Sequence, residues 1–325
     1  TLAIAVSTLA LLLCALSLAP SRPLRSARRA LCGAGVAVAL GMLVRADGVL
    51  LGPCLLLPLL LRRESLGARM RMVALAISCA LITYSPWVLR NIHTFGAPYP
   101  FGSLCEIDGT PIERTWFHNW YASWVRTETD LLSTQGCIYR RTCGSAPLLF
   151  PEYAFDSEQE SEQVNALLLE QSFHGMTAHV DAGFHALWQE RVRRYPVRTF
   201  LIAPAHRVMQ LWLGANDLPV RARPPLHPIR LTDDHEQYAL LAQWTTWLAL
   251  SGALALLLPW WRRQRNLLWL AVLAIGVRTA FLALFGFPEP RYTLELLPLV
   301  LVLAGIAVVT PLRLLWAAAG AFRGR

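Results

Sequence analysis

Long apolar runs alternate with short arginine-rich blocks along this chain, and this alternation limits what the chain can fold into. Hydrophobic residues make up 55% of the 325 residues and charged residues only 16%, a composition too apolar for an ordinary soluble domain. Several of the runs approach the ~20 residues that a membrane-spanning helix needs. The sequence therefore predicts a membrane protein that crosses the bilayer many times.

The arginine blocks predict how often the chain crosses. All 30 basic residues are arginine, and 11 of them stand in three short blocks between apolar runs, at 22–29, 62–71 and 262–265. Basic residues in short loops favour the cytoplasmic side of a membrane. The first two blocks share that side only if residues 30–61 cross twice. As a single helix, residues 30–61 would be ~48 Å long, too long for one comfortable span. We expect two short helices that turn at Arg45–Gly48.

The same reasoning gives seven spans in an all-α, polytopic membrane helix bundle. Residues 1–91 hold four transmembrane helices, and residues 92–237 form a mostly helical external domain with interfacial helices. Residues 238–325 hold three more transmembrane helices and a cytoplasmic tail. Residues 196–213 are apolar enough to suggest an eighth span, but that span would place the block at 262–265 outside. We therefore assign 196–213 to the external domain.

Aromatic residues recur in the first half of the external domain. Trp116, Trp120 and Trp124 are spaced four residues apart and share one helical face. Amphipathic aromatic rings are favoured at the membrane interface, which predicts a short interfacial helix. The alternative is that these rings form a buried face of the external domain. Further along, Ser157 and Glu160 have capping-box spacing, and residues 177–194 are expected to be helical up to Pro196.

The seven cysteines divide by location. Cys14, Cys32, Cys54 and Cys79 lie in apolar runs, where cysteine acts as a small hydrophobic residue. Cys105, Cys137 and Cys143 lie in the external segment. Of these, Cys137 and Cys143 are close enough in sequence to close a small disulfide loop in an oxidising compartment. Such a bond would stabilise the protein by the low end of ~2–4 kcal/mol.

Arginine and polar residues stand where apolar runs meet polar segments, and these junctions supply the candidate binding residues. An ionisable group at such a place is costly unless it is paired or solvated, and arginine can hold a phosphate group through two hydrogen bonds. Glu295, one helical turn after Arg291, is placed to pair with it. The simpler alternatives are interfacial anchoring and local ion pairs. The candidate residues for a lipid phosphate and its sugar are Arg45, Asp47, Arg90, Asn91, Glu289, Arg291 and Tyr292.

Several other functions lack support in the sequence. The net charge of +9 is explained by membrane orientation, so no nucleic-acid partner is expected. The chain has neither a G-x-x-x-x-G-K-[ST] phosphate loop nor a G-x-S-x-G nucleophile elbow. The spacing of His174, His179, His185 and His206 does not place two metal ligands together. We expect no cofactor and identify no metal ligands, although a divalent metal is compatible with the chemistry considered below.

Three short motifs resemble those of bacterial type C glycosyltransferases, the polyprenyl-phosphate-sugar-dependent enzymes that include aminoarabinose transferases and protein O-mannosyltransferases of the glycosyltransferase family 39 type. Arg45-Ala-Asp-Gly48 is similar to the family's Arg-Pro-Glu/Asp-Gly turn, with Ala46 in place of proline. Pro86-Trp-Val-Leu-Arg-Asn91 resembles its Pro-Trp-x-x-Arg-Asn junction. Pro290-Arg-Tyr292 resembles its Arg-Tyr segment before the last span. The resemblance covers the C-terminal two-thirds or so of such an enzyme.

The resemblance implies a membrane enzyme that moves a sugar from a polyprenyl-phosphate donor to a glycan, lipid or protein acceptor. The implied location is the bacterial inner or plasma membrane, with the active site facing outward and membrane lipids as neighbours. The family's catalytic carboxylate precedes the part that this chain resembles. We therefore expect the catalytic residue upstream of Thr1 and this chain to be a fragment without activity of its own. The alternative is a transporter or flippase component that binds anionic glycolipids without chemistry.

Overall fold

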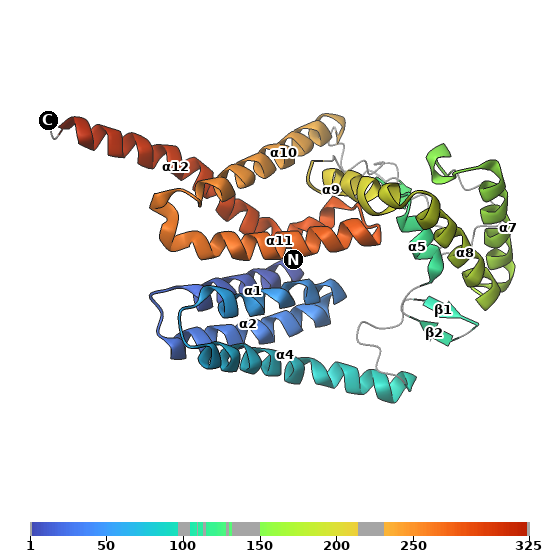
Figure 1. Cartoon of the computed structure of the whole chain (residues 1–325), viewed down its shortest axis with the longest axis horizontal. Helices are drawn as coiled ribbons and strands as arrows, with labels where there is room; N and C mark the ends of the chain where they lie inside the picture. The colour runs from blue at the N-terminus through green and yellow to red at the C-terminus, as the bar shows by residue number, and fades with distance from the viewer. Residues whose placement is uncertain are drawn as a thin grey trace. The chain divides into compact units, whose positions relative to one another are not determined.

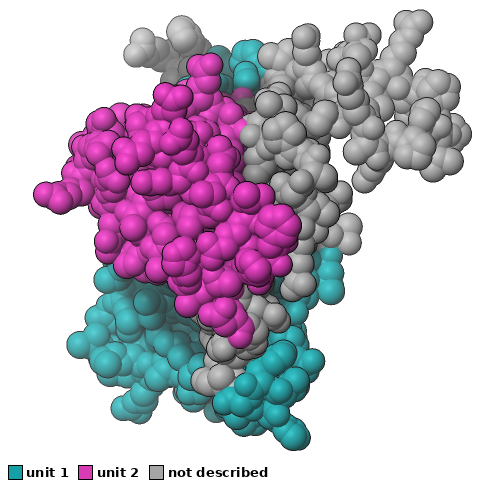
Figure 2. Space-filling model, turned by 90° about the vertical axis from the view of Figure 1, so that its right-hand side faces the viewer, with its two compact units in different colours: residues 1–98, 240–278, 292–325 teal, residues 99–239, 279–291 magenta. Residues whose placement is uncertain are grey.

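The chain forms two compact units of helices. The computed structural model describes residues 2–96, 105–108, 110–112, 115–127, 130–131, 150–213 and 231–323. Unit 1 combines Thr1–Pro98, Leu240–Arg278 and Tyr292–Arg325, and unit 2 combines Tyr99–Ala239 with Thr279–Arg291 (Figure 2). The predicted boundaries at 92 and 237 lie close to those of unit 2. The short segment 279–291 also belongs to unit 2, whereas the sequence assigns it to the C-terminal spans.

Unit 1 is built from long apolar helices. In its N-terminal part α1, α2 and α4 lie side by side, and η1 packs on α2 (Figure 1). Gly35 on α2 lies against the carbonyl of Ala76 on α4, where an added Cβ would stand 2.2 Å from the oxygen, so this glycine lets the two helices approach closely. The elements are α1 Leu2–Leu18, α2 Leu24–Val44, η1 Ala46–Leu56, α3 Leu57–Leu61, α4 Leu66–Phe95, α10 Leu231–Ala255, η5 Pro259–Gln264, α11 Arg265–Phe285, η6 Pro290–Leu296 and α12 Leu297–Arg323.

Four helical segments of the described chain are long and apolar enough to cross a membrane. They are Leu24–Val44, Leu66–Phe95, Arg265–Phe285 and Tyr292–Arg313, and two shorter apolar helices cover Leu2–Leu18 and Ala46–Leu61. Each of the seven predicted spans thus falls on helical structure, although the first of the three C-terminal spans corresponds to α10, which is not among the four. The predicted fold class, an all-α membrane helix bundle with a mostly helical second domain, is confirmed.

The three arginine-bearing loops of unit 1 meet at one end of its helices. Arg62 donates a hydrogen bond to the carbonyl of Ser17 at 2.6 Å and another to the carbonyl of Arg22 at 3.2 Å. Asn266, next to the third block, donates to the carbonyl of Leu18 at 2.7 Å. Arg62 is itself paired with Glu64. The blocks therefore share one side of unit 1, which is the arrangement that the seven-span interpretation requires.

Unit 2 is a helical domain with one small hairpin. Thr177 caps α8 by accepting a hydrogen bond from the backbone of Val180, and the helix ends before Pro196, so the predicted helix at 177–194 is confirmed. The hairpin pairs Cys105 with Ile112 and Ile107 with Thr110 in antiparallel register. The elements are β1 Cys105–Ile107, β2 Thr110–Ile112, α5 Trp116–Ala122, η2 Glu152–Ala154, α7 Glu158–His174, α8 Ala178–Arg194, η3 Arg198–Ile202 and α9 Ala203–Leu213.

The aromatic face of α5 is the core of unit 2, so the prediction of an interfacial helix at this place is wrong. Phe117, Trp120, Tyr121 and Trp124 are at most 2% exposed, and Trp116 is partly buried against the same cluster. Phe184 on α8 lies edge-on to Phe117 at 4.9 Å between ring centroids. The spacing of four identified the shared face, but the rings pack against α7 and α8 and are shielded from lipid.

The predicted disulfide lies outside the described residues. Cys137 and Cys143 both fall in the segment 132–149, so their bond stays a prediction. Cys14, Cys32, Cys54 and Cys79 are free thiols, and Cys14 and Cys54 are buried in unit 1. These four therefore act as packing residues, as their apolar surroundings predict.

Candidate functional site

The predicted turn at Arg45–Gly48 is confirmed, and its backbone fixes the directions of Arg45 and Asp47. Arg45 ends α2 in an extended conformation, and its N–H donates to the carbonyl of Gly41 at 2.8 Å. Gly48 donates in turn to the carbonyl of Arg45 at 2.9 Å. A Cβ on Gly48 would stand 2.6 Å from the carbonyl carbon of Gly41. Only glycine fits this close approach of η1 to α2 without a shift of the backbone.

Gly48→Ala is therefore expected to lower the free energy of unfolding by ~1–3 kcal/mol, because the added methyl meets backbone atoms that cannot rotate away. Gly52→Ala in the same element is the matched control, since a Cβ at Gly52 has no atom within 4 Å. Detergent-solubilised variants can be compared by titration with a denaturing detergent. Equal stability of the two variants would show that the turn tolerates a side chain.

The turn places Asp47 in a buried charge cluster with Arg278 and Glu295. Arg278 on α11 is 1% exposed and binds Asp47 Oδ2 at 2.6 Å and Glu295 Oε2 at 3.2 Å. Its Nε donates to the carbonyl of Tyr292 at 2.7 Å, so all three guanidinium nitrogens are bonded. Ser7 on α1 donates to Glu295 Oε2 at 3.1 Å. We call Arg278, Asp47, Glu295, Arg45, Tyr292 and Ser7 the Arg278 cluster.

Arg45 is the exposed member of the Arg278 cluster. Its side chain is 35% exposed, whereas those of Asp47, Glu295 and Arg278 are 15%, 4% and 1% exposed. It lies 3.2 Å from Asp47, 3.4 Å from Glu295 and 4.9 Å from the centre of the Tyr292 ring. Arg45 therefore joins the buried ions to the surface of unit 1.

The charges of the Arg278 cluster balance, but its hydrogen bonds leave room for a ligand. Two guanidinium groups face two carboxylates, which is how an apolar interior tolerates ions. Within the described part of the chain, Asp47 Oδ1 is buried without a hydrogen-bond partner. A hydroxyl group brought by a ligand could satisfy this oxygen, while the exposed guanidinium of Arg45 could bind an anion.

Arg90 and Asn91 lie in the last two turns of α4, which continues to Phe95. The helix ends at Gly96, whose φ of 70° supplies the left-handed cap, so α4 continues past the predicted boundary at 91. Asn91 is fully buried and accepts a hydrogen bond from Arg90 at 3.1 Å, and Arg90 lies over the Trp87 ring at 5.0 Å. These contacts of the described side chains do not join Arg90 to the Arg278 cluster.

The third motif, Pro290–Tyr292, is divided between the two units, because unit 2 ends at Arg291 and unit 1 resumes at Tyr292. Tyr292 belongs to unit 1 and to the Arg278 cluster, whereas Glu289 is fully buried in unit 2. The backbone of Arg291 is part of η6, and its side chain lies outside the described structure. Glu295, expected to pair with Arg291, binds Arg278 and Arg45. Among the predicted residues whose side chains are described, the structure brings together Arg45, Asp47 and Tyr292.

Arg278 is the site residue that sequence reasoning missed. The predicted site residues lie at junctions between apolar runs and polar segments, whereas Arg278 lies inside the apolar run 267–285. A cation within a predicted span is expensive and marks a functional or paired position by default. The position of Arg278 within a predicted span is visible in the sequence, but it does not identify Asp47 and Glu295 as the partners.

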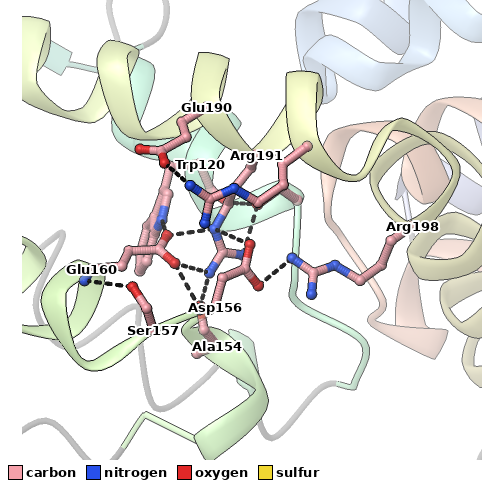
Figure 3. Close-up of polar contacts among 10 residues, drawn as sticks. Trp120, Ala154, Asp156, Ser157, Glu160, Glu190, Arg191 and Arg198 are labelled. Atoms are coloured by element: carbon pink, nitrogen blue, oxygen red, sulfur yellow. Dashed lines mark hydrogen bonds and ion pairs between the residues drawn. The ribbon is translucent and has the colours of Figure 1, made fainter.

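Unit 2 has a polar network of its own around Arg191 (Figure 3). Arg191 on α8 binds both carboxylate oxygens of Glu160, at 2.5 Å and 3.0 Å, and donates to the carbonyl of Ala154. Trp120 donates to Glu160 at 3.0 Å, and the backbone of Glu160 donates to Ser157 at 3.1 Å, which confirms the predicted helix cap. These groups satisfy one another and lie around the N-terminus of α7, so we assign the network to the stability of unit 2.

Within the described residues, no three side chains of His, Cys, Asp or Glu are arranged to hold a metal ion. Comparison with protein-family models, with characterised proteins and with solved structures gives no match to this chain. The function is therefore argued from the Arg278 cluster and from the motifs that contribute to it.

Proposed function

We propose that this chain forms the lipid-phosphate-binding part of a membrane glycosyltransferase that takes its sugar from a polyprenyl phosphate. The proposed acceptor is a glycan, lipid or protein outside the cytoplasm. The proposal places the protein in the bacterial inner or plasma membrane. The end with the three arginine loops faces the cytoplasm, because short basic loops favour that side, and the Arg278 cluster at the other end of α2 faces outward.

The observation that carries this proposal is the position of Arg45. Its guanidinium is partly exposed, while its orientation is held by Asp47, Glu295 and the Tyr292 ring. A planar guanidinium group held in this way can bind two oxygens of a phosphate group. Three members of the cluster, Arg45, Asp47 and Tyr292, also belong to two of the three motifs that resemble those of the type C enzymes, the Arg45–Gly48 turn and the Pro290–Tyr292 segment.

In the proposed reaction, an acceptor hydroxyl attacks the anomeric carbon of the lipid-linked sugar. The new glycosidic bond forms as the bond between that carbon and the phosphate oxygen breaks, and the polyprenyl phosphate leaves. A carboxylate takes the hydroxyl proton, and we propose that this residue lies outside the chain described here. Arg45 would stabilise the charge that develops on the leaving phosphate, with Arg90 and Arg291 as further proposed phosphate ligands. Asp47 Oδ1 would accept a hydrogen bond from a sugar hydroxyl.

Arg45→Lys should weaken binding of undecaprenyl phosphate about ten- to a hundredfold, since a charge-assisted hydrogen bond contributes ~1.5–3 kcal/mol and lysine lacks the planar fork. Binding is measured on the purified chain in nanodiscs. Arg63→Lys is the matched control, because Arg63 is exposed and lies in a loop at the other end of unit 1. Undecaprenol, which has no phosphate, should bind the parent and Arg45→Lys equally.

Two results would contradict the proposal. If the folded Arg45→Lys variant binds undecaprenyl phosphate like the parent, the Arg278 cluster is structural. If the parent does not distinguish the phosphate from the alcohol, no lipid-phosphate site exists. A transporter for anionic glycolipids predicts the same binding loss and would leave the donor intact. A transferase that includes its catalytic carboxylate and is supplied with its acceptor releases free polyprenyl phosphate.

A further inference from the structure

The segment from Val197 to Met209 in unit 2 presents a row of large apolar side chains on its surface. Leu201 is 65% exposed and Phe200 is 51% exposed. The aromatic residues of the core of unit 2, by contrast, are buried. Contiguous exposed apolar surface marks a contact with a partner or a membrane. We define the Phe200 face as Val197, Phe200, Leu201, Ile202 and Met209, all of which are exposed.

The opposite side of the segment is anchored to unit 2, so the direction of the Phe200 face is fixed. Thr199, Ala203, Arg207 and Leu211 recur every four residues, and all four are buried. Arg207 is fully buried and donates to the carbonyls of Ala122 and Val125 at 2.7 Å and 2.9 Å. Burial lowers the pKa of Arg207 to about 10, which leaves it a cation at neutral pH. Rotation of the helix would break these bonds.

The end of α9 is joined to a helix that is long and apolar enough to span the membrane. Trp212 Nε1 donates to Thr279 Oγ1 on α11 at 3.0 Å, and both residues belong to unit 2. Thr279 precedes Phe285, the last residue of α11, by ~9 Å along the helix axis. This bond holds the end of α9 against the part of the spanning helix that leads to Phe285.

Arginine residues border the Phe200 face on its N-terminal side. Arg193 is exposed at the end of α8, Arg194 pairs with Glu190 at the surface, and Arg198 pairs with Asp156. Exposed apolar residues beside arginine are typical of helices that lie in the membrane interface, where the cations meet anionic headgroups. The exposed Arg193 and the apolar row therefore both favour an anionic lipid surface as the partner.

We propose that the Phe200 face lies in the lipid interface of the bilayer and that anionic phospholipids cover it. This contact would hold unit 2 against the membrane by its own surface, in addition to its covalent links to the spanning helices. The proposal does not depend on the glycosyltransferase proposal, because it uses none of the residues of the Arg278 cluster.

A photoreactive phenylalanine tests this proposal in the intact chain. Phe200 is replaced by p-benzoylphenylalanine, and the protein is reconstituted in nanodiscs of phosphatidylethanolamine and phosphatidylglycerol. Phe173 on α7 is the matched control, since it is an equally large side chain and is 74% exposed on the same unit. After illumination, mass spectrometry should detect lipid adducts at position 200 at several times the yield at position 173.

Met209 provides a second position if substitution at Phe200 impairs folding. Lipid adducts at 209 that exceed those at 173 would support the proposal in the same way. Equal adduct yields at the test and control positions would overturn it. Adducts at 200 or 209 with peptides of this chain, or with a second copy of it, would also overturn it and would identify a protein surface as the cover of the Phe200 face.

Discussion

Arg278→Met should lower the free energy of unfolding by ~3–5 kcal/mol, because it leaves the carboxylates of Asp47 and Glu295 buried without their main partner. Methionine nearly fills the volume of the aliphatic part of arginine, so the loss of stability measures the effect of removing the charge. Arg45 cannot take over this role, since it already binds both carboxylates from the exposed side at 3.2 Å and 3.4 Å. Stability is measured by titrating the purified protein with a denaturing detergent.

Two further variants separate charge from packing. Arg29→Met is the control, since Arg29 is an exposed residue of α2 and its loss should change stability by less than ~0.5 kcal/mol. Adding Asp47→Asn to Arg278→Met removes one uncompensated carboxylate, so the double variant should be more stable than Arg278→Met alone. If the double variant is the less stable of the two, the energetic account of the Arg278 cluster is wrong.

Much of the fold could be predicted because membrane helices follow simple rules of length and charge. Apolar runs of about 20 residues predict spans, and the clustering of arginine predicts which loops share a side. The contact of Arg62 with the carbonyls of Ser17 and Arg22 agrees with that prediction. The turn at Arg45–Gly48 was also predictable, because one long apolar segment could not serve as a single span.

The partners within the site could not be predicted in this way. Asp47 and Arg278 are 231 positions apart in sequence, and Ser7 and Glu295 are 288 apart. Hydropathy places each residue on a helix but does not specify which helices adjoin or how each is rotated. The aromatic residues of α5 illustrate the same limit, because their spacing identifies a face but not whether lipid or protein covers it.

Arg191→Met should lower the free energy of unfolding by ~3–5 kcal/mol, because Glu160 would stay buried without its cation. In the parent, Arg191 is 2% exposed and binds Glu160 through two hydrogen bonds, and its remaining donors reach Ser123 and Ala154 (Figure 3). Arg193→Met is the matched control on the same helix, since Arg193 is exposed. Tryptophan fluorescence during unfolding gives the measurement.

The pH dependence of the free energy of unfolding should also change sign in Arg191→Met. Burial alone would raise the pKa of Glu160, but the bonds from Arg191 and Trp120 outweigh burial and hold that pKa below its usual range. The bonded carboxylate therefore stabilises the parent fully above the unfolded pKa of about 4.3, and this contribution is lost as pH falls through the folded pKa. Without Arg191, burial should raise the pKa of Glu160, so Arg191→Met should gain stability as the pH falls from 7 toward 5. A variant that loses stability with acid over that range would show that Arg191 does not set the ionisation of Glu160.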